Sequence, residues 1–151
     1  MSENTFLYLI PNTIGNNEID NTIPIGVKNV IKKLDYFIVE NEKKARKLIK
    51  LVAPKKDQSK IFINVINKHS PINESKSFLE ACMDGYSIGL ISDSGCPAIA
   101  DPGSSIIYEA HNLKIKVKPL VGASSIFLAL MSSGMNGQNF SFNGYLPINH
   151  K

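Results

Sequence analysis

Cysteine is scarce in this chain of 151 residues, and the two that occur, Cys82 and Cys96, stand apart from one another. Two scattered cysteines are too few for a disulfide framework or a cysteine-rich zinc site. They suit a reducing compartment, so we expect a cytoplasmic protein. Long apolar runs are missing as well, which excludes a membrane-spanning segment, and the polar start Met1–Asn4 is not typical of a secretion signal.

Repeats and low-complexity tracts are also missing, whereas the overall composition is that of a globular protein. Hydrophobic residues make up 43% of the chain and charged residues 20%. The length is sufficient for one domain with a hydrophobic core. The net charge of +4 permits a nucleic-acid partner without requiring one.

Short apolar runs alternate with amphipathic stretches along the chain, which indicates βαβ units and a parallel sheet. We therefore expect an α/β fold with a five-stranded parallel sheet and flanking helices. The predicted strands are Phe6–Ile10, Tyr36–Glu40, Ile61–Val65, Ile88–Ser92 and Ile115–Leu120. The predicted helices are Gly26–Leu34, Lys43–Val52, Asn73–Met83, Ser104–Ala110 and Ala123–Ser133, and Phe140–Pro147 is expected to be a short strand or a linker. The order of the strands does not follow from the sequence.

The most informative stretch is Gly89–Gly103, in which an apolar run opens into a loop with two Asp, two Pro and further Gly residues. Such a run predicts a strand whose carboxyl end leads into a tight turn, and Ser104 then begins a helix. Open α/β sheets bind ligands at that end of their strands. A well-capped connection without a ligand is the plainer alternative, although two Asp-containing turns exceed what a connection needs.

Residues 92–103, Ser-Asp-Ser-Gly-Cys-Pro-Ala-Ile-Ala-Asp-Pro-Gly, resemble the signature S-D-A-G-x-P-x-I-x-D-P-G of the tetrapyrrole methylase superfamily. These class III methyltransferases use S-adenosyl-L-methionine. The chain is most similar to the branch of the ribosomal RNA small-subunit methyltransferase I family, which methylates a cytidine ribose 2′-hydroxyl. Four further segments agree with that branch in the same order: Leu7–Asn16, Leu34–Glu42, Pro119–Ser125 and Phe140–Pro147.

The resemblance implies which residues contact the cofactor, and it assigns them to the loops after three strands. These residues are Thr13, Ile91, Ser92, Asp93, Gly95, Cys96, Gly122, Ser124 and Ser125. Asp93 is able to accept hydrogen bonds from a ribose hydroxyl or an ammonium group. Gly95 and Gly122 allow the backbone to approach a ligand closely. Ser124 and Ser125 have a second interpretation, because serine often caps a helix N-terminus.

Glu40 and His69 are the candidates for a catalytic base, because they lie at the ends of the second and third predicted strands, on the same edge of the sheet. A hydroxyl nucleophile benefits from a base that accepts its proton. The alternatives are an ordinary loop histidine and a glutamate favoured by a helix dipole. Cys96 lacks a nearby basic partner and is not expected to be a nucleophile. Asp93 and Asp101 are explained by rigid turns, so we expect no metal site.

Several positions depart from the family pattern. Thr13 stands where the family has a proline, Asn41 and Glu42 replace an Asp-Thr pair, and only His69 remains of an E-H-N stretch. These departures fall in loops that face a substrate, which leaves two alternatives open. One is a tetrapyrrole methyltransferase acting on a uroporphyrin or corrin, and the other is a non-catalytic module that binds the cofactor or forms dimers.

The resemblance also implies a second domain that follows this one. We expect residues 1–147 to form the N-terminal domain and residues 148–151 to begin a linker. The expected partners are small-subunit ribosomal RNA and a second copy in a homodimer, without a membrane. The basic run Lys43–Lys47 is a solvated helix face or a contact to an RNA backbone. Met131 and Met135 are expected to fill a core or an interface.

Overall fold

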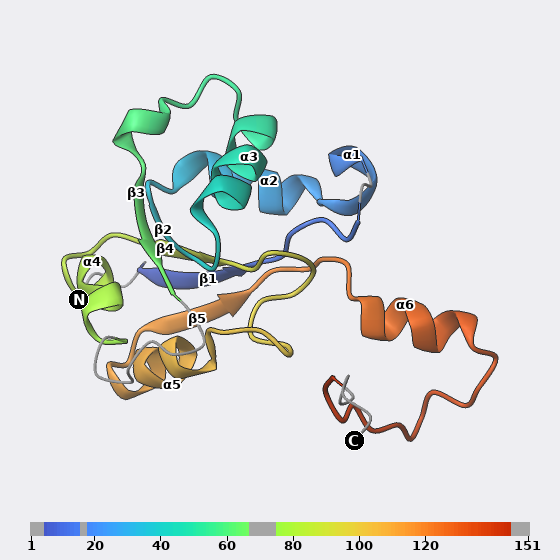
Figure 1. Cartoon of the computed structure of the whole chain (residues 1–151). Coiled ribbons are helices and arrows are strands. Elements are labelled where there is room, and N and C mark those ends of the chain that lie inside the picture. The colour runs from blue at the N-terminus through green and yellow to red at the C-terminus, as the bar shows by residue number, and fades with distance from the viewer. Residues whose placement is uncertain (1–4, 16–17, 67–74, 146–151) are drawn as a thin grey trace, which may run out of the picture.

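The computed structural model describes residues 5–15, 18–66 and 75–145 (Figure 1). Its strands are β1 (Phe6–Ile10), β2 (Tyr36–Val39), β3 (Phe62–Val65), β4 (Ile88–Ile91) and β5 (Lys116–Pro119). Its helices are α1 (Ile19–Thr22), α2 (Ile25–Lys33), α3 (Glu42–Val52), α4 (Glu80–Met83), α5 (Ser104–Asn112) and α6 (Ser125–Ser132), with short 3₁₀ helices η1 (Gln58–Lys60) and η3 (Ser77–Leu79). No helix in these ranges combines the length and apolar character that crossing a membrane requires.

The five strands form one parallel sheet in the order β3-β2-β4-β1-β5. The predicted α/β class and the five-stranded parallel sheet are therefore confirmed. Parallel strands must be joined by crossovers that lie on the faces of the sheet, and here helices fill that role. Strand β4 is buried along its whole length, as expected for a strand near the centre of a sheet that is covered on both faces.

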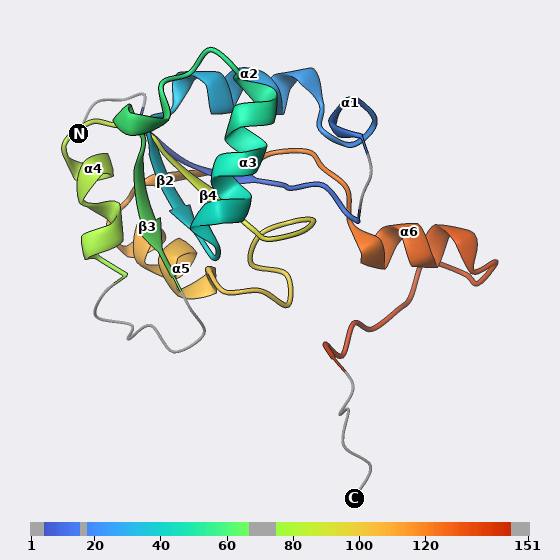
Figure 2. The same ribbon diagram turned by 45° about the horizontal axis from the view of Figure 1, so that its top comes forward.

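Two helical layers cover the sheet, with α2 and α3 on one face and α4 and α5 on the other (Figures 1 and 2). The alternation of side chains along β2 matches these layers. Phe37 and Val39 pack in the core beneath α2 and α3, whereas Ile38 packs in the core beneath α4 and α5. A side chain at Gly89 would have no room in the core beneath α2 and α3, because an added Cβ would lie 2.6 Å from Ile10 Cδ1.

One predicted helix differs from the observed elements, and one observed helix was not predicted. The expected helix Asn73–Met83 begins outside the described residues, and its described part consists of η3 and α4. The apolar pattern does not distinguish a 3₁₀ turn from an α-helix, because the buried Leu79 and Cys82 are three residues apart. Helix α1 was not predicted. Residues 140–145 form no strand, which agrees with the linker alternative, and residues 146 and 147 lie outside the described ranges.

Strands β1 and β4 are parallel neighbours in the sheet, but the connections that follow them lie on opposite faces. The loop after β1 leads to α1 and α2 on one face, whereas the loop after β4 leads to α5 on the opposite face (Figure 1). Neighbouring loops that diverge in this way leave a crevice at the carboxyl edge of the sheet. Ligands of open α/β sheets bind at this kind of position.

Helix α6 extends away from the layered body in both ribbon views (Figures 1 and 2). None of its residues is buried, although its sequence, Ser-Ile-Phe-Leu-Ala-Leu-Met-Ser, is mostly apolar. Met131 and Met135 are 80% and 77% exposed. The expectation that these two methionines fill a core is therefore wrong for this chain, and the interface alternative stays a prediction.

Candidate functional site

Asn12 joins the loops that follow β1 and β4. Its backbone N–H donates to Gly95 O at 2.9 Å, and its side-chain Nδ2 donates to Ser92 O at 3.0 Å and to Asp93 O at 3.3 Å. Its Oδ1 accepts from the Thr13 N–H at 2.8 Å. Because Asn12 is buried and bonded on every side, it holds the two loops in a fixed relative position.

The turn after β4 is closed by its own hydroxyl groups. The buried Ser92 Oγ donates to Gly95 O at 2.7 Å, and Ser94 Oγ donates to Thr13 O at 3.2 Å. Gly95 has φ +66°, a conformation that glycine adopts without strain. The Ser92 hydroxyl is thus committed to the turn, and its contribution to a ligand site is to shape the loop.

Asp93 is the acidic side chain at the centre of this edge. Its Oδ2 accepts from Lys44 Nζ at 2.6 Å, and its backbone N–H donates to Glu40 Oε1 at 3.4 Å. Lys44 lies in the first turn of α3, which begins directly after β2. The pair forms because β2 and β4 are neighbours in the sheet, so the loops that follow them lie side by side.

Glu40 has its pKa raised above the ordinary value for a glutamate. Partial burial is the largest cause, and the negative charge of Asp101 adds to it. The Asp93 N–H and Lys44 act in the opposite direction and are weaker. A carboxylate with a raised pKa is a stronger proton acceptor than a free glutamate, which is the property a general base needs.

The second half of the loop after β4 has an unusual backbone. Ala98 and Ala100 adopt φ values of 64° and 60°, which non-glycine residues rarely do. Gly103 precedes α5 with φ +124°, where an added Cβ would approach Leu90 Cδ2 to 3.0 Å. Strain of this kind is held by the surrounding structure, and it is frequent in loops that contact ligands.

The loop after β5 completes the edge. Cys96 Sγ donates to Ala123 O at 3.5 Å, and burial raises the pKa of this thiol, which disfavours a thiolate. Ser124 is the residue before α6, but its hydroxyl makes no capping hydrogen bond. Gly122 lies against the Pro11 ring, because an added Cβ would be 2.2 Å from Pro11 Cβ and Cγ. The side-chain space of Gly122 is therefore filled by Pro11.

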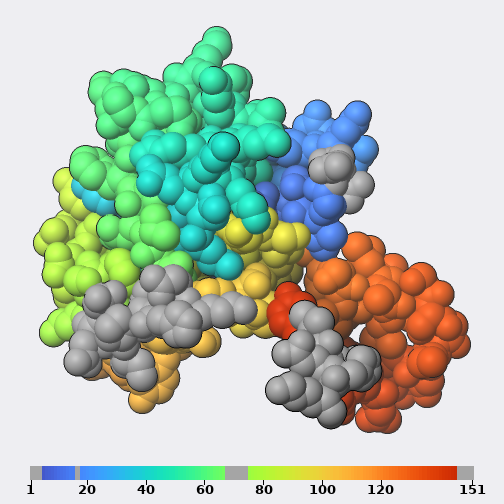
Figure 3. Space-filling view, in the orientation of Figure 1, coloured from blue at the N-terminus to red at the C-terminus, as the bar shows by residue number. Residues whose placement is uncertain are grey.

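Two cavities open on this edge, and Asp93 and Ser94 line both. One has a volume of about 890 Å³ and lies between the loop after β1, α1 and α3. The other has a volume of about 320 Å³ and lies between the loops after β4 and β5. In Figure 3 the yellow loop after β4 lies at the surface between the teal α3 and the orange α6. Both volumes fall within the range of small-molecule sites, about 300–1,000 Å³.

Most of the cofactor residues predicted from the sequence come together around these cavities. Thr13 lines the larger one, and the smaller one is lined by Gly95, Cys96, Ser124 and Ser125. Ile91 is buried at the end of β4, so it presents only backbone groups. Glu40 lies beside Asp93, and His69 lies outside the described residues.

Three residues of this edge were not predicted as site residues. Asn12 joins two loops, Lys44 pairs with Asp93, and Asp101 lines the smaller cavity. Lys44 belongs to the basic run 43–47, whose Arg46 pairs with Glu42 at 2.7 Å, so this run is only in part a solvated face. Among the described residues, no three His, Cys, Asp or Glu side chains gather as ligands for a metal ion.

Comparison with known proteins gives consistent names. No protein-family model matches the chain. Among curated proteins, it is 32% identical over 145 residues to Ribosomal RNA small subunit methyltransferase I of Vibrio cholerae, covering 96% of this chain and 48% of that protein. Proteins of the same name match at 31% identity from Buchnera aphidicola over 145 residues (96% of this chain, 49% of that protein) and from Bacillus subtilis over 147 residues (96% and 47%).

The chain thus spans about half the length of the curated relatives it matches. The matches extend far beyond the loop after β4, since they cover nearly the whole of this chain. The resemblance predicted from the motifs is therefore confirmed, and the chain is a relative of the ribosomal RNA small subunit methyltransferase I proteins.

Proposed function

We propose that this chain is the cofactor-binding part of an S-adenosyl-L-methionine-dependent methyltransferase that acts on small-subunit ribosomal RNA. The observation that carries this proposal is that the loops after β1, β4 and β5 lie together around Asp93. They meet where the connections after β1 and β4 go to opposite faces of the sheet. The names of the relatives support the same activity. The proposed nucleophile is a cytidine ribose 2′-hydroxyl.

The residues around Asp93 fit a positively charged cofactor. Glu40, Asp93 and Asp101 bring three carboxyl groups to this edge, and Lys44 is the cation paired with Asp93. An excess of carboxylates favours a ligand that carries sulfonium and ammonium groups. Asp93 is able to exchange its Lys44 contact for a ligand hydroxyl or ammonium, because both side chains are partly exposed.

The remaining contacts come from backbone groups and small side chains. Ile91 and Ser92 line neither cavity, so their proposed contribution is limited to backbone groups at the end of β4, where Ser92 O already accepts from Asn12 Nδ2. Gly95 lines the smaller cavity. Ser124 and Ser125 line the smaller cavity beside Cys96. Because the Ser124 hydroxyl makes no capping bond, it remains available to a ligand. Thr13 lines the larger cavity, on the side where a substrate is able to enter.

Bound S-adenosyl-L-methionine supplies a methyl group that its positive sulfur already activates. The protein therefore needs only to hold the hydroxyl nucleophile in line with the methyl group and to accept the proton of that hydroxyl. Glu40 is the proposed acceptor of the proton from the hydroxyl nucleophile. Its raised pKa and its place beside Asp93 support this role, and His69 is kept as the second candidate.

The proposal extends to the assembly of the protein. Residues 1–147 are proposed as the N-terminal domain, and residues 148–151 as the start of a linker to a second domain, because the relatives are about twice as long. A homodimer is proposed through the apolar surface of α6 and residues 140–145, where Phe127, Phe140 and Phe142 are each about half exposed. A ribosomal substrate implies a cytoplasmic protein.

Calorimetric titration tests the proposal. S-adenosyl-L-methionine and its demethylated product are titrated into this chain and into a version that carries the second domain. We expect saturable binding with a stoichiometry of one to the two-domain version, and weaker binding to this chain. The tetrapyrrole alternative is tested separately, by measuring tritium transfer from labelled cofactor to uroporphyrin and to small ribosomal subunits. An absence of cofactor binding in both versions would contradict the proposed function.

A further inference from the structure

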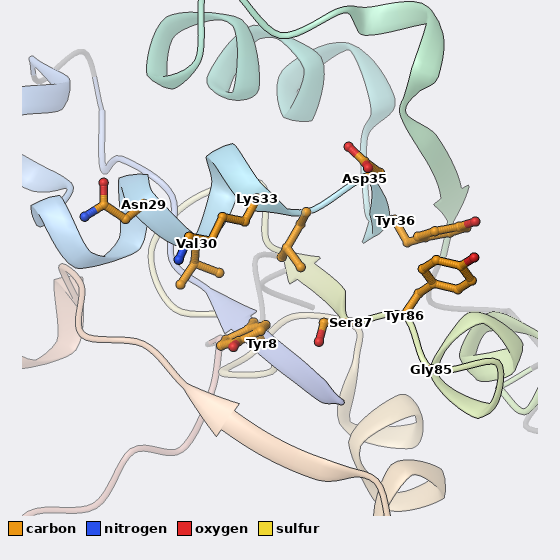
Figure 4. A pocket seen from close by; sticks show the side chains of 10 residues that line it. Tyr8, Asn29, Val30, Lys33, Asp35, Tyr36, Gly85, Tyr86 and Ser87 are labelled. Carbon is orange, nitrogen blue, oxygen red and sulfur yellow. The ribbon is translucent and has the colours of Figure 1, made fainter. Parts of the chain in front are cut away.

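A groove of about 370 Å³ lies at the amino edge of the sheet, on the side opposite the candidate site. Tyr8 of β1 lies at one end, and Tyr36 and Tyr86 lie at the other, next to the starts of β2 and β4 (Figure 4). Asn29 and Lys33 of α2 form one wall. One strand length, about 15 Å, separates this groove from the carboxyl edge.

Three tyrosines line the groove, Tyr8, Tyr36 and Tyr86, and Phe62 lies next to it, stacked on Tyr36. Tyr36 stacks on Phe62 with ring centroids 5.0 Å apart, and Tyr86 lies 5.2 Å from Tyr36 in a tilted arrangement. Phe62 is 61% exposed and Tyr86 is 55% exposed. Neighbouring, partly exposed rings of this kind offer flat surfaces onto which further aromatic groups are able to stack.

Two lysines lie over aromatic rings at the other end of the groove, where Tyr8 contacts Phe6. Lys118 Nζ lies 5.5 Å from the centre of the Phe6 ring and 5.9 Å from that of Tyr8, and Lys116 Nζ lies 5.9 Å from Phe6. Lys33 is exposed along the wall. The one carboxylate that lines the groove, Asp35, is paired with Lys56 at 2.7 Å. The surroundings of the groove are therefore positively charged.

We propose that this groove binds a single-stranded segment of the RNA substrate. Bases of the segment stack beside Tyr86 and Phe62, and its phosphates lie near Lys33 and Lys118. Exposed rings with interspersed cations are what single-stranded nucleic acids need, because every base has a stackable face and every phosphate a charge. The inference rests on the proposed RNA substrate and adds a second contact, remote from methyl transfer.

Charge complementarity favours RNA over a protein partner here. In the described residues, Lys33 and Lys118 form no ion pair, and Lys118 lies over aromatic rings instead. The centre of a protein interface is usually depleted of lysine, whereas a nucleic-acid groove is enriched in it.

The test measures fluorescence anisotropy of a labelled single-stranded RNA of about twelve nucleotides, a length that such sites accommodate. The charge variant K33Q/K118Q removes two cations from the groove. The matched control K50Q/K114Q removes two exposed cations that line neither the groove nor the cavities of the candidate site, Lys50 on α3 and Lys114 after α5. The stacking variant is Tyr86→Ala, and its control is Tyr108→Ala, a tyrosine that is 66% exposed on α5. Circular dichroism and thermal melting verify that each variant is folded.

We expect K33Q/K118Q and Tyr86→Ala each to weaken RNA binding by about tenfold, and both controls to change it less than about twofold. Loss of two phosphate contacts should also make the negative slope of log K against log salt shallower by about 1.4. Equal losses of RNA affinity in K33Q/K118Q and K50Q/K114Q, or unchanged RNA binding in Tyr86→Ala, would overturn the proposed groove.

The outcome is distinguishable from that of the proposed function. Cofactor titration of the same variants reports on the carboxyl edge alone. If the protein binds the cofactor but K33Q/K118Q and Tyr86→Ala bind RNA as tightly as the parent chain, only this inference is contradicted. Groove-dependent RNA binding without cofactor binding supports the inference and contradicts the proposed function. A chain without affinity for single-stranded RNA contradicts the groove as an RNA site.

Discussion

At the scale of single residues, Asp93 connects the two cavities of the carboxyl edge and pairs with Lys44. Replacing it by alanine in a two-domain version removes one charged hydrogen-bond acceptor. We expect S-adenosyl-L-methionine binding to weaken by at least roughly 1.5 kcal/mol, the scale of a hydrogen bond to a charged group. Calorimetric titration measures this change. Asp84→Ala, at an exposed position after α4, is the control, and equal affinities of the two variants would remove Asp93 from the site.

Gly122 and Gly26 offer a matched pair for stability. The Gly122→Ala variant places a Cβ 2.2 Å from the Pro11 ring, so the loops after β1 and β5 must separate. We expect a loss of about 1–3 kcal/mol in the free energy of unfolding, typical of an overpacked site. Gly26→Ala meets open space in α2 and is expected to stabilise by about 0.5–1 kcal/mol. Urea denaturation measures both changes in the free energy of unfolding. An unchanged free energy of unfolding in Gly122→Ala would refute the close contact between Gly122 and Pro11.

Glu40 provides a test that depends on pH. Because its folded-state pKa is raised, mainly by burial, the unfolded chain loses this proton first as pH rises. Its ionisation therefore lowers stability above the unfolded-state pKa, and this loss is complete above the folded-state pKa. We expect Glu40→Gln to raise the melting temperature slightly at neutral pH and to leave it unchanged at about pH 3, which lies below the pKa of this carboxyl in both states. An effect of the same size at both pH values would be inconsistent with this assignment.

The sequence predicts much of this edge because its residues lie within one short stretch. The turn at Gly95, the start of α5 at Ser104 and the candidate residues 91–96 all follow from the motif and its glycines. The pairing of Lys44 with Asp93 could not be predicted, because it depends on the adjacency of β2 and β4. The role of Gly122 was missed for the same reason, since Pro11 and Gly122 meet only after β1 and β5 pair.

At the scale of elements, hydrophobic periodicity predicted all five strands to within one residue at each end. These strands are short apolar runs bounded by polar turns, which is a strong signal. The helices were less certain where the pattern is short. Four-residue α1 was missed, and the described part of the helix expected at 73–83 divides into η3 and α4. Elements of one turn take their conformation from packing rather than from their own pattern.

Helix α6 carries the prediction of self-association. Its apolar side chains remain exposed, and only Phe127 and Phe140 form a ring contact, at 6.0 Å, among the described aromatic residues of this region. An exposed apolar surface of this kind tends to bury itself against a partner. We expect the chain to be a homodimer at tens of micromolar, because twofold dimers are the commonest assembly.

Light scattering measures this assembly directly. The double variant F142E/Y145E places charges in the proposed interface and should be monomeric. Tyr108→Glu adds a charge at an exposed aromatic residue on α5 and should remain dimeric. A monomeric parent chain, or a dimer that F142E/Y145E leaves intact, would count against this interface.

At the scale of the whole molecule, the sheet and its two helical layers form a complete core, whereas α6 extends away from that body (Figure 2) and only its first residues line the smaller cavity. We therefore expect the 151-residue chain to fold alone but to transfer no methyl group, because a substrate needs a wall on both sides of the cofactor. Tritium transfer from labelled cofactor to small ribosomal subunits measures this activity. A two-domain version is the positive control, and transfer by the short chain itself would disprove the expectation.

The strand order also determines when the protein is able to fold. Strand β1 is synthesised first, yet both of its neighbours, β4 and β5, come late, with Leu7 paired to Ile88 and to Val117. At the usual pace of translation, Leu7 waits roughly 4 to 16 s before Ile88 is made. During that interval an apolar strand has no sheet to join. The centre of this fold is thus completed only once β5 has been synthesised, and nascent chains that end before β4 carry an unpaired β1.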